Sequence, residues 1–499
     1  MVGVLDTGTS SSGDATTGTT SGSAPTRPVP VGGSGLGWVF AAFFGVFGWA
    51  VGIAKLSDNS FFWHLKTGGY ILDHGIPHHD VFSYTAPGTK WIAQSWLAEV
   101  TYALIDRSVG ANGIRLFVGL VGVGIGMLSY RLALHLCRDR MIACGLTAAA
   151  LAGIYTVWSE RPLLIGVLFL IVLLWVVEVP DSLVGRHPLV VIPVLMWLWA
   201  NTHGTFELGF AYLGLHLLGR WFDGHRPWEG RERALLVGSV IACFAILVNP
   251  YGVDLLLFPI ALLSRGDILS HVIEWQSPDF RQTWGLALGL WIVVYLVALA
   301  RGRNRVTRRD LVVTIPMLLL ALWAVRNVAI APLIGLPVVA RCFARDEEQP
   351  SSVGRPLVVG AITVLVLAAL VMGFEVTQES PYDLATYPTA AMHYVERHGL
   401  IGTRLLTTDA TAGWVILDHY PEQKVFMDDR YDMYPTSVIY DYFKILEGKP
   451  GWDKVLDKYQ VETIVWPAKS AFGSLLDESS QWKRVYTKGG DAVWVRAGS

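Results

Sequence analysis

Charged residues are scarce in this chain of 499 residues. Asp, Glu, Lys and Arg make up 16% of it, whereas an ordinary soluble domain carries about a quarter. Hydrophobic residues account for 52%, and the mean hydropathy is +0.43. This balance excludes a large soluble enzyme and predicts a polytopic α-helical membrane protein. The net charge of −2 identifies no partner, and we expect no nucleic acid among the partners.

Cysteine is also rare, and the cysteines present lack the spacing of a metal site. Cys137, Cys144, Cys243 and Cys342 lie in or beside apolar segments, as small buried hydrophobic residues do. Residues 1–34 are poor in apolar side chains and rich in Ser, Thr, Gly and Pro. They lack the basic start, apolar core and cleavage site of a secretory signal. We predict a disordered cytoplasmic tail over 1–34.

A run of about 20 apolar residues crosses the ~30 Å hydrocarbon core of a bilayer. Such runs, two of them short, recur through residues 35–375 and predict about eleven transmembrane helices. They lie near 35–56, 112–132, 141–158, 162–180, 188–201, 205–222, 233–249, 283–300, 310–326, 328–344 and 356–374. With the N-terminus in the cytoplasm, the inner loops hold most of the arginines, which is the positive-inside pattern. The C-terminus then lies outside.

Residues 376–499 have the composition of a globular domain. Helices are expected over 389–398, 435–446 and 452–459. Short strands are expected over 404–408, 424–428 and 462–466, with a hairpin of 485–486 and 492–496. Strands alternating with helices predict a small extracytoplasmic α/β domain.

The segment 57–110, which we call the first large loop, is predicted to follow the first span on the outer face. It begins with Asp58 and continues through His64 to His78-His79-Asp80. A carboxylate directly against an apolar span, among Trp and Phe residues, indicates function rather than solvation. The adjacent histidines point apart in an extended segment, which favours a surface loop over a metal site. Asp80 is a candidate to fold back towards Asp58.

Further polar residues collect at the outer ends of other spans. Taken singly, each can be a turn, a helix cap or an interfacial anchor. Charge near hydrocarbon is expensive, however, and groups from several connections predict one shared polar cavity that faces outward. The candidates are Glu160, Arg161, Asn201, His203, Tyr251 and Arg326.

The tail domain carries an acidic cluster, Asp428-Asp429-Arg430-Tyr431-Asp432, after a predicted strand. Its carboxylates could bind a divalent cation. We favour a solvated loop that Arg430 neutralises. In a third interpretation the loop is a lid over the membrane cavity, formed by Asp428, Arg430 and Asp432.

The acidic start of the first large loop, the many spans and the outer terminal domain resemble the GT-C class of membrane glycosyltransferases. The chain is also similar to a broad group of bacterial polytopic membrane proteins, from about residue 38 to 496. The shared pattern includes Asp58, Trp63-His64-Leu65, Gly75-Ile76-Pro77, Asp80, Phe82-Ser83-Tyr84-Thr85, Trp91, Trp96-Leu97, Glu99, Arg161-Pro162, Asn249-Pro250-Tyr251-Gly252 and Asp428 with Arg430-Tyr431-Asp432. The resemblance implies a bacterial inner (plasma) membrane protein.

In the GT-C class the first-loop acidic residue is the general base, or a metal ligand in metal-dependent members. The resemblance assigns this role to Asp58. Many GT-C enzymes have a second acidic residue close by, whereas here the neighbours are Ser57, Asn59 and Ser60. This departure weakens the metal-dependent reading, with Mg²⁺ or Mn²⁺ as the cofactor, and we name no metal ligand.

The resemblance implies transfer of a sugar from a polyprenyl-phosphate donor to a cell-envelope glycan, lipid or protein. A carboxylate can take the proton of the acceptor hydroxyl. Arginine suits the departing phosphate, so Arg161 and Arg326, with His203, are expected to bind it. His64, Asp80, Glu160, Asn201 and Tyr251 complete the predicted substrate site.

Two other classes of protein remain open. A transporter or flippase for lipid-linked saccharides should show internal repeats and polar residues at mid-membrane. The sequence shows no such repeat, and its polar residues lie at the outer ends of the spans. A non-catalytic scaffold for envelope assembly would tolerate Asp58→Asn.

Overall fold

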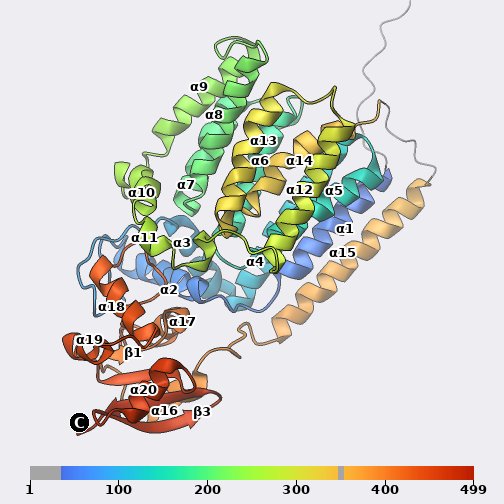
Figure 1. Ribbon diagram of the computed structural model, residues 1–499. Helices are drawn as coiled ribbons and strands as arrows, with labels where there is room; N and C mark the ends of the chain where they lie inside the picture. The colour runs from blue at the N-terminus through green and yellow to red at the C-terminus, as the bar shows by residue number, and fades with distance from the viewer. Residues whose placement is uncertain (1–34, 347–352, 499) are drawn as a thin grey trace, which may run out of the picture.

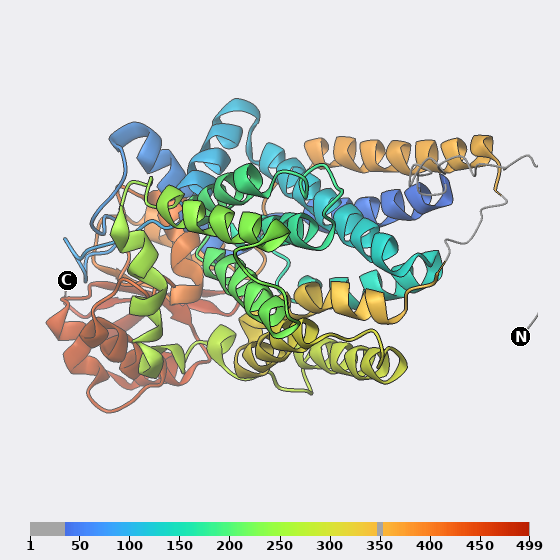
Figure 2. The same ribbon diagram turned by 90° about the horizontal axis from the view of Figure 1, so that it is seen from above.

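The computed structural model describes residues 35–346 and 353–498. Long helices form a bundle, short helices cross one end of it, and a C-terminal domain covers those short helices (Figure 1). We call this covered end the site end. Turned by 90°, the bundle again extends away from the same end (Figure 2). The predicted tail over 1–34 lies outside the described residues.

One helix occupies each of the eleven ranges predicted as spans. They are α1 (Gly35–Gly52), α4 (Ala111–Cys137), α5 (Arg140–Tyr155), α6 (Leu163–Glu178), α7 (Pro188–Thr202), α8 (Phe206–Phe222), α9 (Gly230–Ala245), α12 (Thr283–Arg301), α13 (Arg308–Trp323), α14 (Ile330–Cys342) and α15 (Arg355–Gln378). Within the described residues, five segments qualify as membrane spans by length and apolar composition: 35–52, 111–137, 283–301, 325–342 and 355–378. The chain is therefore a membrane protein, and the number eleven stays a prediction.

Glycines bring α1 and α4 into close contact. A Cβ atom on Gly48 would lie 2.0 Å from the carbonyl oxygen of Gly122, and one on Gly126 would lie 2.0 Å from that of Phe44. Small residues allow helix backbones to approach in this way inside membranes. The long helix α15 packs along α1 at the edge of the bundle (Figure 1) and exposes apolar side chains such as Leu367 and Phe374. Such a surface is suited to lipid.

A buried charge network holds the bundle at the end away from the site end. Arg309 donates to Glu178 and, at 2.9 Å, to Asp310. Arg341 donates to the same two carboxylates, each at 2.7 Å. The network joins α6, α13 and α14. Buried charges are retained when they are paired in this way.

The first large loop is mostly helical. Its helices α2 (Asn59–His74) and α3 (Trp96–Val109) pack together across the site end, where the sequence analysis assigned no helix. Asp58 caps α2, because its carboxylate accepts hydrogen bonds from the backbone N–H groups of Ser60 and Phe61. Short elements follow between the later long helices at the same end: α10 (Val253–Leu263), α11 (Gly266–Leu269), η1 (Ile273–Trp275) and η2 (Val325–Asn327).

The C-terminal domain has a four-stranded sheet in the order β1-β2-β4-β3. Its strands are β1 (Leu405–Leu406), β2 (Thr463–Pro467), β3 (Trp482–Lys488) and β4 (Asp491–Arg496), and only β1 and β2 run parallel. Its helices are α16 (Thr389–Arg397), α17 (Asp409–His419), α18 (Thr436–Leu446), α19 (Trp452–Lys458) and α20 (Ala471–Glu478). The small α/β composition agrees with the prediction, although α17 and α20 were not anticipated.

The C-terminal domain and the first large loop are packed together. The predicted strand over 424–428 forms only single bridges, in which Val425 pairs with Leu405 on one side and with Ser83 of the first large loop on the other. Helix α17 lies directly on α2, where a Cβ atom on Gly413 would lie 2.1 Å from the carbonyl oxygen of Asn59. The backbone N–H of Gly413 donates to the Asn59 side chain at 2.9 Å. These contacts fix the domain on the site end.

Candidate functional site

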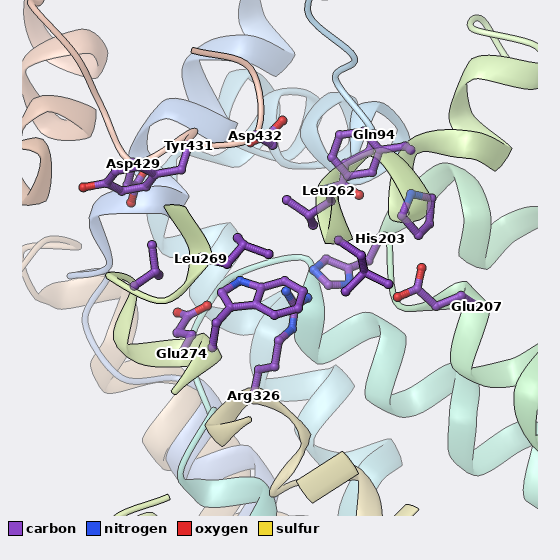
Figure 3. Close-up of a pocket in the computed structure, with 16 residues that line it drawn as sticks. Gln94, His203, Glu207, Leu262, Leu269, Glu274, Arg326, Asp429, Tyr431 and Asp432 are labelled. Atoms are coloured by element: carbon purple, nitrogen blue, oxygen red, sulfur yellow. The ribbon is translucent and has the colours of Figure 1, made fainter. Parts of the chain in front are cut away.

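A polar cavity of about 160 Å³ lies where the bundle, the short helices and the C-terminal domain meet. Figure 3 shows its side chains converging from these separate segments. Of the predicted site residues, His203, Arg326 and Asp432 line it directly. Its polar lining comprises Gln94, His203, Glu207, Glu274, Arg326, Asp429, Tyr431 and Asp432.

Asp58 is held beside this cavity by Arg161. The Nε atom of Arg161 lies 2.7 Å and 2.8 Å from the two carboxylate oxygens of Asp58. Glu160 supports the pair from the same connection between α5 and α6, because its carboxylate accepts the backbone N–H of Asp58 at 2.8 Å. Burial raises the pKa of Glu160, although the hydrogen bonds from the backbone N–H groups of Asp58 and Ser57 oppose the shift. Asp58 and Arg161, both predicted site residues, thus form an ion pair, and Glu160, a third, holds the backbone of Asp58.

Arg161 also reaches the cavity wall. Its Nη1 atom donates to Glu274 at 2.7 Å. Burial tends to raise the pKa of Glu274, but the positive charges of Arg161 and Arg326 lower it overall. Arg161 is therefore shared by two carboxylates, so its positive charge is already balanced. The sequence analysis did not name Glu274 as a candidate.

Arg326, unlike Arg161, has no carboxylate partner among the described residues. It lies 4.3 Å from the ring centre of Trp275 in a cation–π contact, and both residues line the cavity. Within 35–346 and 353–498, no carboxylate forms an ion pair with Arg326 and no hydrogen bond fixes its guanidinium. A half-buried arginine with this freedom is suited to bind an anion that enters the cavity.

His203 lines the same cavity as a neutral side chain. Burial lowers its pKa to about 3, and the charges of Arg326 and Arg161 add to the effect. Its Nδ1 atom accepts the backbone N–H of Thr205 at 3.2 Å. This bond assigns the proton to Nε2, which can donate a hydrogen bond.

Asp429 is a cavity residue that the sequence analysis did not single out, although it named both neighbours. Its carboxylate accepts hydrogen bonds from Ser60 Oγ at 2.6 Å, Trp63 Nε1 at 2.6 Å and Asn59 Nδ2 at 3.1 Å. All three donors are neutral and belong to the start of α2. Burial raises the pKa of Asp429 to about 7, and the charges of Asp428 and Asp58 add to the shift. Arg161 and the Ser60 hydrogen bond oppose it.

The neighbouring residues of the acidic cluster are deeply buried. Arg430 donates to Asp428 at 2.7 Å and 2.8 Å and to Asp80 of the first large loop at 2.8 Å. The guanidinium also lies 4.4 Å from the ring centre of Trp91. The expectation of a solvated loop was wrong, because these partners exclude water. Asp80 faces Arg430 rather than Asp58, and Asp428 and Arg430 form a fixed joint between domain and loop.

His64 forms a second buried pair, with Glu99 of α3. The Nδ1 atom of His64 lies 2.7 Å from the Glu99 carboxylate. Burial lowers the pKa of His64 well below its usual value and raises that of Glu99 well above its own. The pair packs α2 against α3 and does not line the cavity.

The side chains of Asn201 and Tyr251 are also engaged in structural hydrogen bonds. Asn201 is buried, accepts the indole N–H of Trp96 at 2.7 Å and donates to the carbonyl oxygen of Trp197 at 2.8 Å. The Tyr251 hydroxyl donates to the carbonyl oxygen of Pro77 at 2.9 Å and accepts the N–H of Ala93 at 3.0 Å. Both residues hold the first large loop in place over the bundle.

Within the part of the chain that the structure describes, the carboxylates at the cavity do not bring three ligand atoms together. Asp58 and Glu274 are both bound by Arg161, while Asp428 turns away to Arg430. Among the described residues, the one group whose ligand atoms converge is Glu396, Asp418 and His419, on α16 and α17. None of these three residues lines the cavity.

Comparison with known proteins places the fold. No protein-family model and no curated protein matches the sequence. The structure is similar to the oligosaccharyltransferase of Archaeoglobus fulgidus tethered to an acceptor peptide with the NVT sequon, at a TM-score of 0.50 and 11% identity. The match covers 92% of this chain and 74% of that one. The apo form of the same enzyme gives a TM-score of 0.45 at 10% identity, over the same shares of both chains. The first likeness supports the predicted GT-C fold.

Proposed function

We propose that this protein is a glycosyltransferase that moves a sugar from a polyprenyl-phosphate donor to a cell-envelope acceptor on the outer face of the membrane. The observation that carries the proposal is the cavity at the site end. It places a free arginine, a neutral histidine and a carboxylate together in a protein with the GT-C fold. A lipid-linked donor can reach such a cavity from the bilayer while its sugar stays in the polar space.

Arg326 is the proposed partner of the donor phosphate. It is a cavity cation without a carboxylate partner in the described chain, and a phosphate can accept both its charge and its N–H groups. The neutral His203 adds a hydrogen bond through Nε2–H without adding charge. Trp275 contacts the guanidinium through the cation–π interaction and leaves its N–H groups available. As the glycosidic bond breaks, negative charge grows on the phosphate, and these groups stabilise it.

The acceptor is proposed to enter beside the C-terminal domain. That domain contributes Asp429, Tyr431 and Asp432 to the cavity, whereas Arg326 and His203 come from the bundle. Asp58 remains the sequence-based candidate for the general base, and its contact with Arg161 gives it a second candidate role as the anchor of that arginine. The acceptor can be a glycan, a lipid or a protein. A peptide acceptor belongs in the test because the similar archaeal enzyme was solved with one.

The test is sugar transfer by the purified full-length protein in lipid. Radiolabelled polyprenyl phosphates carrying different hexoses and pentoses are supplied with envelope extract and with peptide acceptors. We expect turnover with one donor and a reduced rate in Asp58→Asn, with folding checked by thermal unfolding. Failure to turn over or bind any donor would exclude the glycosyltransferase. Donor binding with transbilayer movement but without transfer would instead identify a flippase.

A further inference from the structure

The geometry points to Asp429 of the C-terminal domain as the group that takes the proton from the acceptor hydroxyl, with Asp58 acting as a positioning residue through Arg161. This inference rests on the proposed glycosyltransferase function and names the base within it. It follows from the contrasting surroundings of two carboxylates, Asp429 in the cavity lining and Asp58 beside the cavity.

Both carboxylate oxygens of Asp58 are engaged by the guanidinium of Arg161. One of its oxygens accepts hydrogen bonds from the backbone N–H groups of Ser60 and Phe61 and from Arg161. The other oxygen is also within hydrogen-bond distance of Arg161, at 2.8 Å. Taking a proton would break a charge-assisted pair and leave Arg161 with one carboxylate partner, Glu274. Asp58 is therefore better placed to orient Arg161 than to act as a base.

Asp429 has the opposite surroundings. Its hydrogen-bond donors are a hydroxyl, an amide and an indole, and no cation forms an ion pair with it among the described residues. Its Oδ1 atom accepts one hydrogen bond, from Trp63, and so keeps a lone pair free. The residue lines the cavity together with Arg326. A hydroxyl placed between these residues would have its proton acceptor on the domain side and the donor phosphate on the bundle side.

The electrostatic surroundings support the same assignment. The titratable groups that face Asp429 are Arg161 and Asp58 from the bundle side, Asp428 and Tyr431 from its own loop, and Tyr387 from the segment before α16. Burial and the two aspartates raise the pKa of Asp429 to about 7 against the opposing charge of Arg161. A base is most effective when its pKa lies near the working pH. Two carboxylates with divergent environments are a recurrent sign of divided catalytic roles.

The proposed step is balanced as follows. The acceptor oxygen forms a bond to the anomeric carbon as its proton passes to Asp429. The bond between the anomeric carbon and the phosphate oxygen breaks, and its electron pair stays on that oxygen. The products are the glycosylated acceptor, polyprenyl phosphate and protonated Asp429, which then releases its proton to water.

The experiment compares wild type with Asp429→Asn, Asp58→Asn and the control Asp453→Asn, which lies on α19 away from the cavity. Donor binding and the pH dependence of kcat/KM are measured for each with the active donor. In wild type, kcat/KM should rise with pH through about 7, because the base must lose its proton. Asp429→Asn should bind donor normally, lose at least about a hundredfold in turnover and lose this rise. Asp58→Asn should be slowed but keep the rise, and Asp453→Asn should match wild type.

The outcomes separate the two proposals. If wild type is active and Asp429→Asn keeps the rate and the rise near pH 7, Asp429 is not the base. If the rise disappears in Asp58→Asn and persists in Asp429→Asn, the sequence-based assignment to Asp58 is correct. Wild type that turns over no donor would overturn the proposed function, and this inference would fall with it. Lost donor binding would show that a variant is misfolded. In that case Asp429→Glu, which restores a carboxylate, is the deciding variant: Asp429 is the base if the rise of kcat/KM with pH returns, and is not the base if the rise stays absent in a variant that binds donor.

Discussion

Arg161 meets Asp58 through a single nitrogen, with Nε at 2.7 Å and 2.8 Å from the two carboxylate oxygens. This leaves Nη1 to reach Glu274 at 2.7 Å. The guanidinium thus joins Asp58, the cap of α2, to Glu274 of η1. More than half of the residues of the bundle lie between these two positions in the sequence. Arg161 therefore links the start of α2 to a segment that lines the cavity.

Replacement of Arg161 by lysine should impair the protein although the charge is kept. A lysine ammonium is a point charge and cannot reproduce the planar fork that contacts Asp58 and Glu274 together. Loss of one charge-assisted hydrogen bond costs about 1.5–3 kcal/mol. We expect turnover to fall at least about tenfold and the thermal unfolding temperature to drop. Arg281→Lys, at an exposed position of the same end, is the control. Normal turnover in Arg161→Lys would show that the bridge to Glu274 is dispensable.

Replacement of Arg326 by alanine should weaken donor binding without unfolding the protein. In the described chain its guanidinium has only the cation–π contact with Trp275, so its removal leaves no buried carboxylate without an ion-pair partner. Loss of a charged hydrogen bond to phosphate corresponds to about 1.5–3 kcal/mol, or about 10- to 150-fold in Kd. Equilibrium binding of the polyprenyl-phosphate donor measures it, with Arg281→Ala as the control. Unchanged affinity would remove Arg326 from the phosphate site.

The sequence predicted the membrane part of the fold well because hydrophobic run length is a local property. It also predicted that Asp58, Arg161, His203 and Arg326 lie at one end of the bundle, since each follows or precedes a span. It could not reveal that Arg161 binds Asp58, or that Asp80 pairs with Arg430, because these contacts join segments more than a hundred residues apart. The sequence named Asp429 only as a member of the acidic cluster, for the same reason: its hydrogen-bond donors lie in α2.

Replacement of Arg430 by alanine should destabilise the whole site end. The side chain is 1% exposed and neutralises both Asp428 and Asp80. Removing the cation leaves two buried carboxylates with neutral hydrogen-bond donors but no cationic partner, and breaking a buried ion pair typically costs about 3–5 kcal/mol. Denaturant or thermal unfolding of the protein in detergent measures the loss, with the exposed Arg404→Ala as the control. The triple change Arg430→Met, Asp80→Asn and Asp428→Asn should recover part of it, because no unpaired charge remains. A wild-type unfolding temperature in Arg430→Ala would contradict the described joint.

Replacement of Gly413 by alanine should separate the C-terminal domain from α2. The new Cβ atom would lie 2.1 Å from the carbonyl oxygen of Asn59, so α17 must move by more than an ångström or the backbone must distort. Overpacking of this kind costs about 1–3 kcal/mol. Because Asn59, Ser60 and Trp63 hold Asp429, the displacement should also lower turnover and shift its pH dependence towards that of a more exposed carboxylate. As exposure lowers the raised pKa, the rise of kcat/KM should move to lower pH. Gly145→Ala in α5, where a Cβ meets no atom within 4 Å, is the matched control. If Gly413→Ala keeps both the stability and the pH profile of wild type, the close contact between α17 and α2 does not position Asp429.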